Sequence, residues 1–431
     1  MKLYDAVIIG GGIAGLASAL QISNEGINDI IILEKEEYLG GNLNSCIDAG
    51  YGETFFNENM TGVEYAQRFI DEIERRKIEY RTKTTVIEVK NFDGYKETTL
   101  VNEEGITTIR SKSIVFTMGC KEKPRGSAHI SANKCAGVFT AGMVQRFVNV
   151  QGVMPGREVV IFGSGDVALI VAKRLIIEGG NVVSIVEPMS LCRATQANIK
   201  GCIDYFNIPL SLKHTIVEIV GDDRVEAVVV AEVDDSLNVI KGTEKTIKCD
   251  TLILSVGLYP ENEFLRQLGV ELNKVTGGPI IDEVMQCSIS GVFASGSITH
   301  PYDHVDDITR ESTIAGRGVS KFLKGELNLE EYIEVHNKKG ILYSLPNKVN
   351  VNNLYYDDLE LRIRLRKPMP RCILKVYVDS EVILEEKREN LYSSELYSIF
   401  LPKKLIENKK EVKSIEISAE PYDYAFINYR R

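Results

Sequence analysis

Two glycine-rich segments carry the residues whose spacing points most clearly to chemistry. They read "GGGIAG" and "GSGDVA", and their glycines are Gly10, Gly12 and Gly15 in the first and Gly163 and Gly165 in the second. Between a strand and a helix, this spacing lets backbone amides approach a pyrophosphate at the helix N terminus. Glu34 and Glu187 each close the next apolar run, where a carboxylate can accept hydrogen bonds from a ribose. The pattern predicts two dinucleotide-binding turns.

An internal repeat places both turns in the same context. "DAVIIGGGIAGLASALQISNEGINDIIILEK", from Asp5, aligns without a gap with "EVVIFGSGDVALIVAKRLIIEGGNVVSIVEP", from Glu158. The second copy has Ala168 at the third glycine position, where we expect its methyl group to separate helix and strand slightly. Glu187 would repel a 2′-phosphate, which favours NAD over NADP, whereas the nearby Arg193 leaves NADP open.

Three further segments run from an apolar strand into a glycine turn. They are "SIVFTMGCKEKPRG" with Gly119, "DTLILSVGLYPENEF" with Gly257, and "SISGVFASGSITH" with Gly296 and Ser297. A helix is expected to begin near Asp306. With the repeat, these segments predict an α/β fold with two Rossmann-like dinucleotide-binding domains. We assign 1–125 plus 279–333 to the first and 126–278 to the second.

The last hundred residues have a different pattern. "LELRIRLRKP" alternates strictly, and "CILKVYVDSEVILEEK", "LYSIFLP" and "VKSIEIS" also favour strands separated by short polar turns. We predict a small, antiparallel, C-terminal all-β domain over 334–431, a pattern compatible with a sandwich, with "YSLPNKVNVNN" as its linker. Its expected role is docking or assembly.

Composition excludes several classes of protein. The net charge of −10 argues against nucleic acid as the main partner. No run of about eighteen apolar residues exists, so we expect no membrane span. Three consecutive glycines would break the helix of an N-terminal signal peptide, and we therefore expect a cytoplasmic protein. The eight cysteines form neither a C-x-x-C pair nor a zinc-like spacing.

At these motifs the sequence resembles the FAD/NAD(P)-binding pyridine nucleotide-disulfide oxidoreductase superfamily, over about residues 3–330. More narrowly, it is similar to the branch that accompanies anaerobic glycerol-3-phosphate dehydrogenases and is related to FAD subunits of amino-acid dehydrogenases. The narrower resemblance rests on "GGNLNSCIDAGYG", "NMTGVEYAQRFIDEI", "MGCKEKPRG", "FTAGMVQRFVN" and "IFGSGDVALIVAKRL".

The resemblance implies FAD on the first unit and NAD(H) on the second. The implied cofactor-binding residues are Gly10, Gly12, Gly15, Glu34, Gly41, Gly119, Gly296 and Ser297 on the FAD side, and Gly163, Gly165, Glu187 and Gly257 on the NAD side. Ser297 stands where the superfamily usually has Asp and the branch often Asn, so a water could bridge its contact with the ribityl chain. The helix after Asp306 would direct its N terminus at the flavin and favour the negative charge of reduced FAD.

Cys46, in "YLGGNLNSCIDAGYGE", lies near where single-cysteine peroxide and oxygen reductases of the superfamily place a redox thiol. The C-x4-C pair of the disulfide reductases is absent, because Leu43 and Asp48 occupy those positions. Cys46 is therefore either a redox thiol cycling through sulfenate or a small residue shaping the flavin pocket. His300, His304 and the neighbouring acids could form a metal cluster, but a loop and helix start explains them better, and we expect no metal site.

Three functions follow from these residues. The first is an FAD-dependent NADH oxidoreductase that passes hydride to the flavin and electrons to a partner redox protein, a partner dehydrogenase or oxygen. The second is a non-catalytic FAD-binding assembly subunit, because Asp48, Ala168 and Ser297 depart from the family pattern. The third is an NADH oxidase or peroxidase using Cys46. Homo-oligomerisation and the direction of electron flow stay open.

Overall fold

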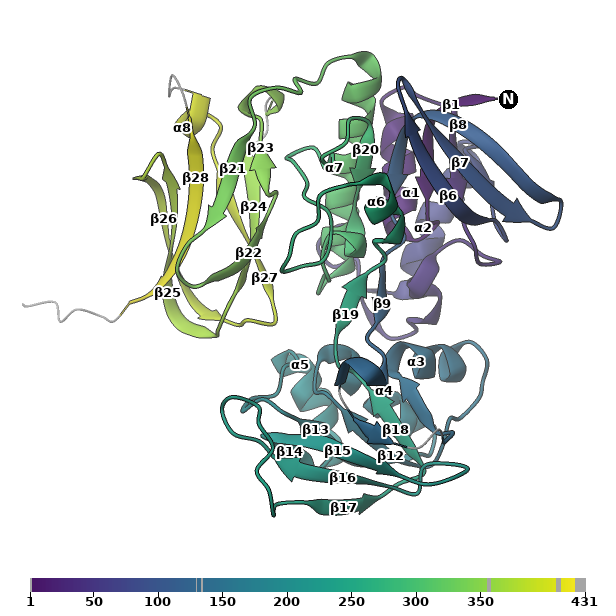
Figure 1. The fold of residues 1–431 in the computed structure, drawn as a ribbon, viewed down its shortest axis with the longest axis vertical. Helices are drawn as coiled ribbons and strands as arrows, with labels where there is room; N and C mark the ends of the chain where they lie inside the picture. The colour runs from purple at the N-terminus through teal and green to yellow at the C-terminus, as the bar shows by residue number, and fades with distance from the viewer. Residues whose placement is uncertain (1, 129, 133–134, 355–357, 408–411, 423–431) are drawn as a thin grey trace, which may run out of the picture. The chain divides into compact units, whose positions relative to one another are not determined.

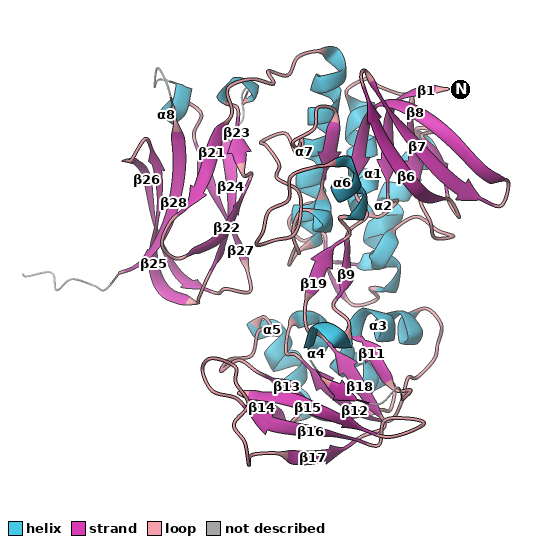
Figure 2. Cartoon of the chain, viewed as in Figure 1, coloured by secondary structure: helices cyan, strands magenta, loops and turns pink. Residues whose placement is uncertain are grey.

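The computed structural model describes residues 2–128, 130–132, 135–354, 358–407 and 412–422. The chain forms two compact units. Unit 1 contains Met1–Leu43, Asp48–Cys120 and Pro260–Arg431, and unit 2 contains Asn44–Ile47 and Lys121–Tyr259. Figure 1 labels the elements of each unit, and Figure 2 shows that both units contain helices as well as strands.

Unit 1 contains a seven-stranded sheet with a parallel centre. Strand β1 (Leu3–Ile9) pairs in parallel with β2 (Ile30–Leu33) on one side and β8 (Gly105–Phe116) on the other. Beyond β2 lies β5 (Glu79–Arg81), and β20 (Val292–Ala294) pairs in parallel with the end of β8. All residues of β2 and β20 are buried, which explains their continuous apolar sequences.

A hairpin and several short elements complete this part of unit 1. Strands β6 (Thr85–Phe92) and β7 (Tyr95–Asn102) form the hairpin, and β7 pairs antiparallel with β8. The remaining elements are β3 (Ala49–Tyr51), β4 (Met60–Thr61), α2 (Gly62–Arg75) and α6 (Glu263–Leu268).

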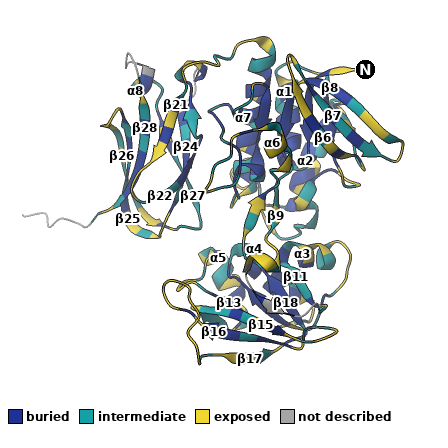
Figure 3. Ribbon diagram, viewed as in Figure 1, coloured by how far each residue is buried: buried dark blue, intermediate teal, exposed yellow. Residues whose placement is uncertain are grey.

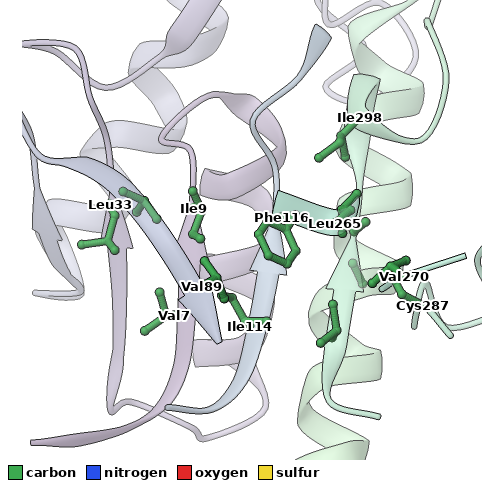
Figure 4. Packing of buried hydrophobic residues seen from close by; sticks show 14 of the residues in the cluster. Val7, Ile9, Leu33, Val89, Ile114, Phe116, Leu265, Val270, Cys287 and Ile298 are labelled. Carbon is green, nitrogen blue, oxygen red and sulfur yellow. The ribbon is translucent and has the colours of Figure 1, made fainter. Parts of the chain in front are cut away.

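Helices α1 (Ile13–Asn24) and α7 (Val305–Lys324) pack closely against each other. Gly316 allows this approach, because a Cβ there would lie 2.7 Å from the Ser18 carbonyl oxygen. Figure 4 shows core side chains of the sheet, including Ile9 and Phe116, in the same cluster as Leu265. The core of unit 1 therefore supports the helix N terminus and strand ends on which the predicted first turn depends.

Unit 2 contains a five-stranded parallel sheet in the order β11-β18-β12-β13-β14. The strand order and the helix after β12 match the predicted second dinucleotide-binding unit. The elements of the sheet and its helices are β11 (Val138–Thr140), α3 (Ala141–Asn149), β12 (Glu158–Phe162), α4 (Asp166–Ile177), β13 (Asn181–Glu187), α5 (Gln196–Asn198), β14 (Leu210–Leu212) and β18 (Thr251–Leu254).

A second sheet of unit 2 has the order β10-β15-β16-β17. Its strands are β10 (Ser131–Ala132), β15 (His214–Val220), β16 (Ala227–Glu232) and β17 (Lys245–Lys248). The short strands β9 (Cys120–Glu122) and β19 (Leu258–Pro260) pair where the chain leaves and re-enters unit 1. The predicted α/β class with two Rossmann-like units is confirmed.

Strands β21–β28 form what we call the C-terminal β-sandwich, which belongs to unit 1. One sheet has the order β23-β21-β28-β25-β26 and the other the order β22-β24-β27, with a buried apolar core of their own. The elements are β21 (Ile333–Asn337), β22 (Ile341–Leu345), β23 (Lys348–Val349), β24 (Leu359–Leu365), β25 (Met369–Val378), β26 (Glu381–Leu391), β27 (Leu396–Leu401), α8 (Lys404–Glu407) and β28 (Ser414–Pro421).

The expectation of a wholly antiparallel C-terminal domain is wrong. β21 and β28 pair in parallel. They are the first and last strands of the sandwich, so no tight hairpin joins them and nothing forces an antiparallel pairing. Strand β25 pairs antiparallel with both β26 and β28, as predicted.

Two assignments at the domain borders also differ from the structure. Leu265 and Val270 pack in the apolar core of unit 1, although residues 260–278 were assigned to the NAD-binding domain. The segment "YSLPNKVNVNN", predicted as a linker, is packed into the fold, because it includes β23 and its Asn350 is fully buried. Figure 3 shows the buried residues of this part of the chain in dark blue. Periodicity does not reveal burial that depends on contacts with distant elements.

Asn350 holds this segment in place through four hydrogen bonds. Its amide nitrogen donates to the carbonyl oxygens of Asn328, at 3.0 Å, and Glu330. Its backbone N–H donates to Glu283 Oε2 at 2.7 Å, and its own Oδ1 accepts from the Asn352 N–H at 3.0 Å.

Among residues that the structure describes, no helix combines the length and the hydropathy that a membrane span requires.

Asn350→Ala should lower the free energy of unfolding by about 2 kcal/mol, because three side-chain hydrogen bonds in a packed segment are lost. Urea denaturation measures this change. Asn352→Ala is the matched control, since its side chain is exposed, and it should change stability by less than about 0.5 kcal/mol. Equal effects of the two substitutions would show that the segment behaves as a loose linker.

Candidate functional site

The first candidate turn joins β1 to α1 at Gly10. This glycine has φ +111°, and a Cβ there would lie 2.6 Å from the Thr117 carbonyl oxygen. The Gly10 N–H donates to the Leu33 carbonyl at 2.9 Å. Thr117 Oγ1 donates toward the carbonyls of Ile9 and Gly10 at 2.9 Å each. The turn is therefore tied to both neighbouring strands, and only glycine fits its first position.

Gly12 and Gly15 have different roles in this turn. A Cβ on Gly15 would lie 1.9 Å from the Gly10 carbonyl oxygen, so Gly15 is required for the helix to pack on the turn. A Cβ on Gly12 would meet nothing nearer than Gly41 Cα, at 3.9 Å. Gly12 is the N-cap residue of α1 and leaves the space beside the helix N terminus open. Such a space, with free amides and the helix dipole, suits a pyrophosphate.

Glu34 and Gly41 come to the same place from outside the turn. Glu34 directly follows β2, and its buried carboxylate accepts from the Gly11 N–H at 2.7 Å and the Glu36 N–H at 2.8 Å. Gly41 lies against Gly12, because a Cβ on Gly41 would be 3.0 Å from Gly12 Cα. The predicted ribose acid and a further glycine therefore adjoin the open space at α1.

The segment after β20 reaches α1 as well. Gly296, at φ +76°, would place a Cβ 2.7 Å from the Ala14 side chain. Ser297 is half-buried in the short turn that follows. Asp306 in the first turn of α7 accepts from the Thr54 N–H and hydroxyl at 2.8 Å each, while its other oxygen, Oδ1, is buried without a partner among the described residues. An open glycine cradle, a ribose acid and a buried unused acceptor together fit FAD.

The turn of unit 2 repeats this geometry. Gly163 has φ +101°, a Cβ there would lie 2.2 Å from the Ser255 carbonyl oxygen, and its N–H donates to Val186 at 2.8 Å. Gly165 is the N-cap residue of α4, and a Cβ there would meet nothing within 4 Å. Ala168 is fully buried in the apolar core, so the helix accepts its methyl group.

Glu187 closes β13 as the counterpart of Glu34. Its buried carboxylate accepts from the Ser164 N–H at 3.0 Å, the Ser164 hydroxyl at 2.7 Å and the Met189 N–H at 2.9 Å. Arg193 is exposed, and its backbone N–H donates to Ser164 Oγ at 3.0 Å. The structure thus brings Gly163, Gly165 and Glu187 together, and they fit a dinucleotide with a free ribose hydroxyl.

Gly119 and Gly257 lie where the chain changes units, outside both turns. Both have positive φ, of +75° and +104°. The Gly119 carbonyl accepts from the Glu261 N–H at 3.1 Å, and the Gly257 carbonyl accepts from the Lys123 N–H at 2.9 Å. They shape the ends of the nucleotide domains, and their predicted cofactor contacts remain proposals.

Cys46 belongs to unit 2 by its contacts. Its half-buried Sγ accepts from Gln145 Nε2, on α3, at 3.8 Å, and the neighbouring Ser45 carbonyl accepts from Asn149 at 2.8 Å. All eight cysteines are thiols without a disulfide. The structure groups Cys46 with α3 of unit 2.

Asp303 and His300, before α7, have separate partners, and His304 is the N-cap residue of α7. Asp303 accepts from Arg364 at 2.9 Å. His300 is fully buried, with its ring beside Tyr302 and Tyr343. Burial, followed by the charges of Arg364 and Arg362, holds the pKa of His300 well below its usual range, so the ring is neutral. These contacts suit a structural loop next to a helix start.

Sequence reasoning missed two kinds of residue around the turns. Thr117 follows β8, and Ser255 follows β18. An alignment of the two repeats that extended to these strands would have found both residues. Glu311 and Arg362 lie in different parts of the chain and form a buried ion pair with N–O distance 3.0 Å. No local pattern connects them.

Comparison with known proteins follows this geometry. The family model described as pyridine nucleotide-disulphide oxidoreductase matches residues 4–315, so the C-terminal β-sandwich lies outside the match. The NAD(P)H sulfur oxidoreductase (CoA-dependent) of Pyrococcus abyssi is 27% identical over 365 residues, covering 82% of this chain and 74% of that protein. The thioredoxin reductase of Listeria monocytogenes is 23% identical over 341 residues, covering 78% of this chain and 98% of that protein.

The crystal structure of T. acidophilum thioredoxin reductase is similar with a TM-score of 0.61. It is 24% identical and covers 74% of this chain and 99% of its own. At that identity the likeness shows the fold alone.

Gly12→Ala should weaken FAD binding without unfolding the protein. The methyl group meets no protein atom closer than 3.9 Å but enters the space suited to the pyrophosphate. Overlap of this kind costs roughly 1–3 kcal/mol, which is about 5-fold to 140-fold in the dissociation constant. Fluorescence titration of the apoprotein with FAD measures the change.

Gly165→Ala is the matched control in unit 2, because its methyl group also meets no protein atom within 4 Å. It should keep the FAD affinity of the unaltered protein and weaken NADH binding instead. Unchanged FAD affinity in Gly12→Ala would remove the first turn from the flavin site.

Proposed function

Because this chain belongs to the pyridine nucleotide-disulphide oxidoreductase family and is an FAD-dependent NAD(P)H oxidoreductase, we propose that it oxidises NADH and delivers the electrons to a partner redox protein or dehydrogenase subunit. The duplicated turn carries this proposal. Each unit has one glycine turn, one open helix N terminus and one buried acid that accepts an N–H of the turn.

Unit 1 holds FAD in this proposal. The α1 amides beside Gly12 and Gly41 bind the pyrophosphate, and Glu34 accepts from the adenosine ribose. Gly296 and Ser297 approach the pyrophosphate and ribityl chain from the other side. Bound FAD supplies a two-electron acceptor for a hydride and can release those electrons to an acceptor.

Unit 2 holds NADH. The amides at the N terminus of α4 bind its pyrophosphate, and the Glu187 carboxylate binds the 2′-hydroxyl of the adenosine ribose. A 2′-phosphate would bring a second negative charge against this buried carboxylate, which already accepts three hydrogen bonds from the protein. Repulsion between buried like charges disfavours NADPH.

The protein needs no nucleophile of its own for this reaction, because hydride passes between the two cofactors. Its residues bind, align and shield them from water. The contact of Cys46 with Gln145 on α3 supports a packing role for that thiol. Cys46 is half-buried and forms no disulfide, and such packed thiols are usually inert.

For the electron acceptor we propose a chemical class and no individual protein. The narrower resemblance, to the branch that accompanies anaerobic glycerol-3-phosphate dehydrogenases, favours a dehydrogenase subunit or a small redox protein. The C-terminal β-sandwich, outside the matched region, is a suitable surface for such a partner. The cytoplasmic location stays a prediction.

An anaerobic titration of the purified flavoprotein with NADH tests the function directly. Flavin absorbance should bleach with about one NADH per FAD, because the flavin is the only two-electron centre in this proposal. Flavin that is bound but never bleaches would support the non-catalytic assembly subunit instead. Cys46→Ser should leave the stoichiometry and turnover unchanged, as should Cys135→Ser, a second half-buried thiol of unit 2.

Uptake of a further two electrons that disappears in Cys46→Ser, but not in Cys135→Ser, would place Cys46 in the reaction. The oxidase or peroxidase function would then replace the proposed one.

Glu187→Gln should raise kcat/KM for NADPH relative to NADH by about tenfold, because it removes the repelling charge and keeps the shape of the side chain. Steady-state kinetics with both nucleotides measures the ratio. Glu178→Gln, an exposed acid at the end of α4, should leave the ratio unchanged. An unaltered ratio in Glu187→Gln would mean that another group selects the nucleotide.

A further inference from the structure

Glu311 and Arg362 form a buried ion pair between α7 and the C-terminal β-sandwich. Their side chains are 1% and 7% exposed, and Arg362 Nη1 donates to Glu311 Oε2 at 3.0 Å. A buried pair of this kind contributes little net stability, because both charges lose their water. Its value is better sought in what the pair holds in place.

The other carboxylate oxygen of Glu311 contacts the Gly296 turn. Oε1 accepts from the Gly296 N–H at 2.8 Å and from Thr299 Oγ1 at 3.4 Å. Gly296 in turn lies against Ala14 in the first turn of α1, at 2.7 Å for a Cβ built on the glycine. The contacts therefore run without a break from β24 through α7 to the open end of α1.

The guanidinium of Arg362 is fixed on its other edges. Nε and Nη2 donate a bidentate pair of hydrogen bonds to the Glu360 carboxylate, at 3.1 Å and 3.0 Å. Nη1 also donates to the Tyr302 hydroxyl at 3.1 Å. Glu360 is in turn held by the Ser398 hydroxyl at 2.6 Å. Two strands of the sandwich, β24 and β27, thus set the position of the charge that faces Glu311.

We infer that Arg362 is a positioning residue for FAD: the C-terminal β-sandwich orients Glu311, and through it the Gly296 turn that meets the cofactor. This inference rests on the proposed function. It assigns to the sandwich a part in completing the flavin site, in addition to any role in docking a partner.

The electrostatics of Glu311 agree with this role. Burial raises the pKa of Glu311 to about 7, although Arg362 lowers it. The Gly296 and Thr299 hydrogen bonds also lower that pKa, and the Glu360 charge raises it. Asp307 contributes to the field at Arg362 from the first turn of α7. Without Arg362 the carboxyl keeps its proton to higher pH, and ionising it becomes costly.

Arg362→Met should raise the FAD dissociation constant by at least about tenfold, because one partner of a buried pair is left without compensation. The loss should be greater at about pH 8.5 than at about pH 6, since the unpaired carboxyl is protonated and neutral at the lower pH. The Arg362→Met/Glu311→Gln double variant should recover much of the affinity and lose this pH dependence. The amide introduced by Glu311→Gln can still accept a hydrogen bond from the Gly296 N–H, and it carries no charge.

Arg364→Met is the matched control. Arg364 is on the same strand and pairs with Asp303 at 2.9 Å, so it also joins the sandwich to the segment before α7, but it has no contact with Gly296. It should lower thermal stability while leaving the FAD dissociation constant within about threefold of the unaltered protein.

FAD titrations of the four full-length proteins separate the outcomes. Equal FAD affinity in Arg362→Met and the unaltered protein, or equal weakening by Arg364→Met, would overturn the positioning role and leave a structural one. Failure of the unaltered protein to bind FAD at all would instead overturn the proposed function.

Discussion

A backbone approach that only glycine permits sets the geometry of both nucleotide turns. Gly10 faces the Thr117 carbonyl, and Gly163 faces the Ser255 carbonyl, at distances where any Cβ would collide. These contacts join β1 to the residue after β8 and β12 to the residue after β18, at the carboxyl ends of these parallel strands. They place the helix N terminus and the acid of the second strand on the same edge, where ligands of open α/β sheets bind. The rest of each candidate site is built around that edge.

The C-terminal β-sandwich solves a second packing problem. Strict alternation along β24 is typical of a strand with one apolar and one solvated face. Here the polar face is also covered. Arg362 is buried and Arg364 is half-buried, and their partners lie on α7 and in the segment just before it. Charged residues on a covered face need partners, and Glu311, Glu360 and Asp303 supply them. The sandwich is therefore integrated with the nucleotide domain, although it has a core of its own.

The arrangement of thiols sets this chain apart from the chemistry in the family's name. None of the eight cysteines forms a disulfide, and Cys46 contacts α3 of unit 2. In the proposed reaction the electrons move between bound cofactors, and the protein contributes alignment and charge. Glu187 and Glu34 each accept an N–H of their own turn, and in the proposed reaction both would accept from a ribose.

The sequence by itself determined the two nucleotide units, their turns and their acids, because glycine spacing, apolar strands and a closing acid are all local and were present twice. It also identified the C-terminal strands by their alternation. Only the tertiary structure decided that β21 and β28 run parallel, that residues 343–353 are packed, and that Arg362 meets Glu311. Such contacts join residues far apart in the chain, and burial of a polar face depends on what covers it. Local periodicity carries no record of either.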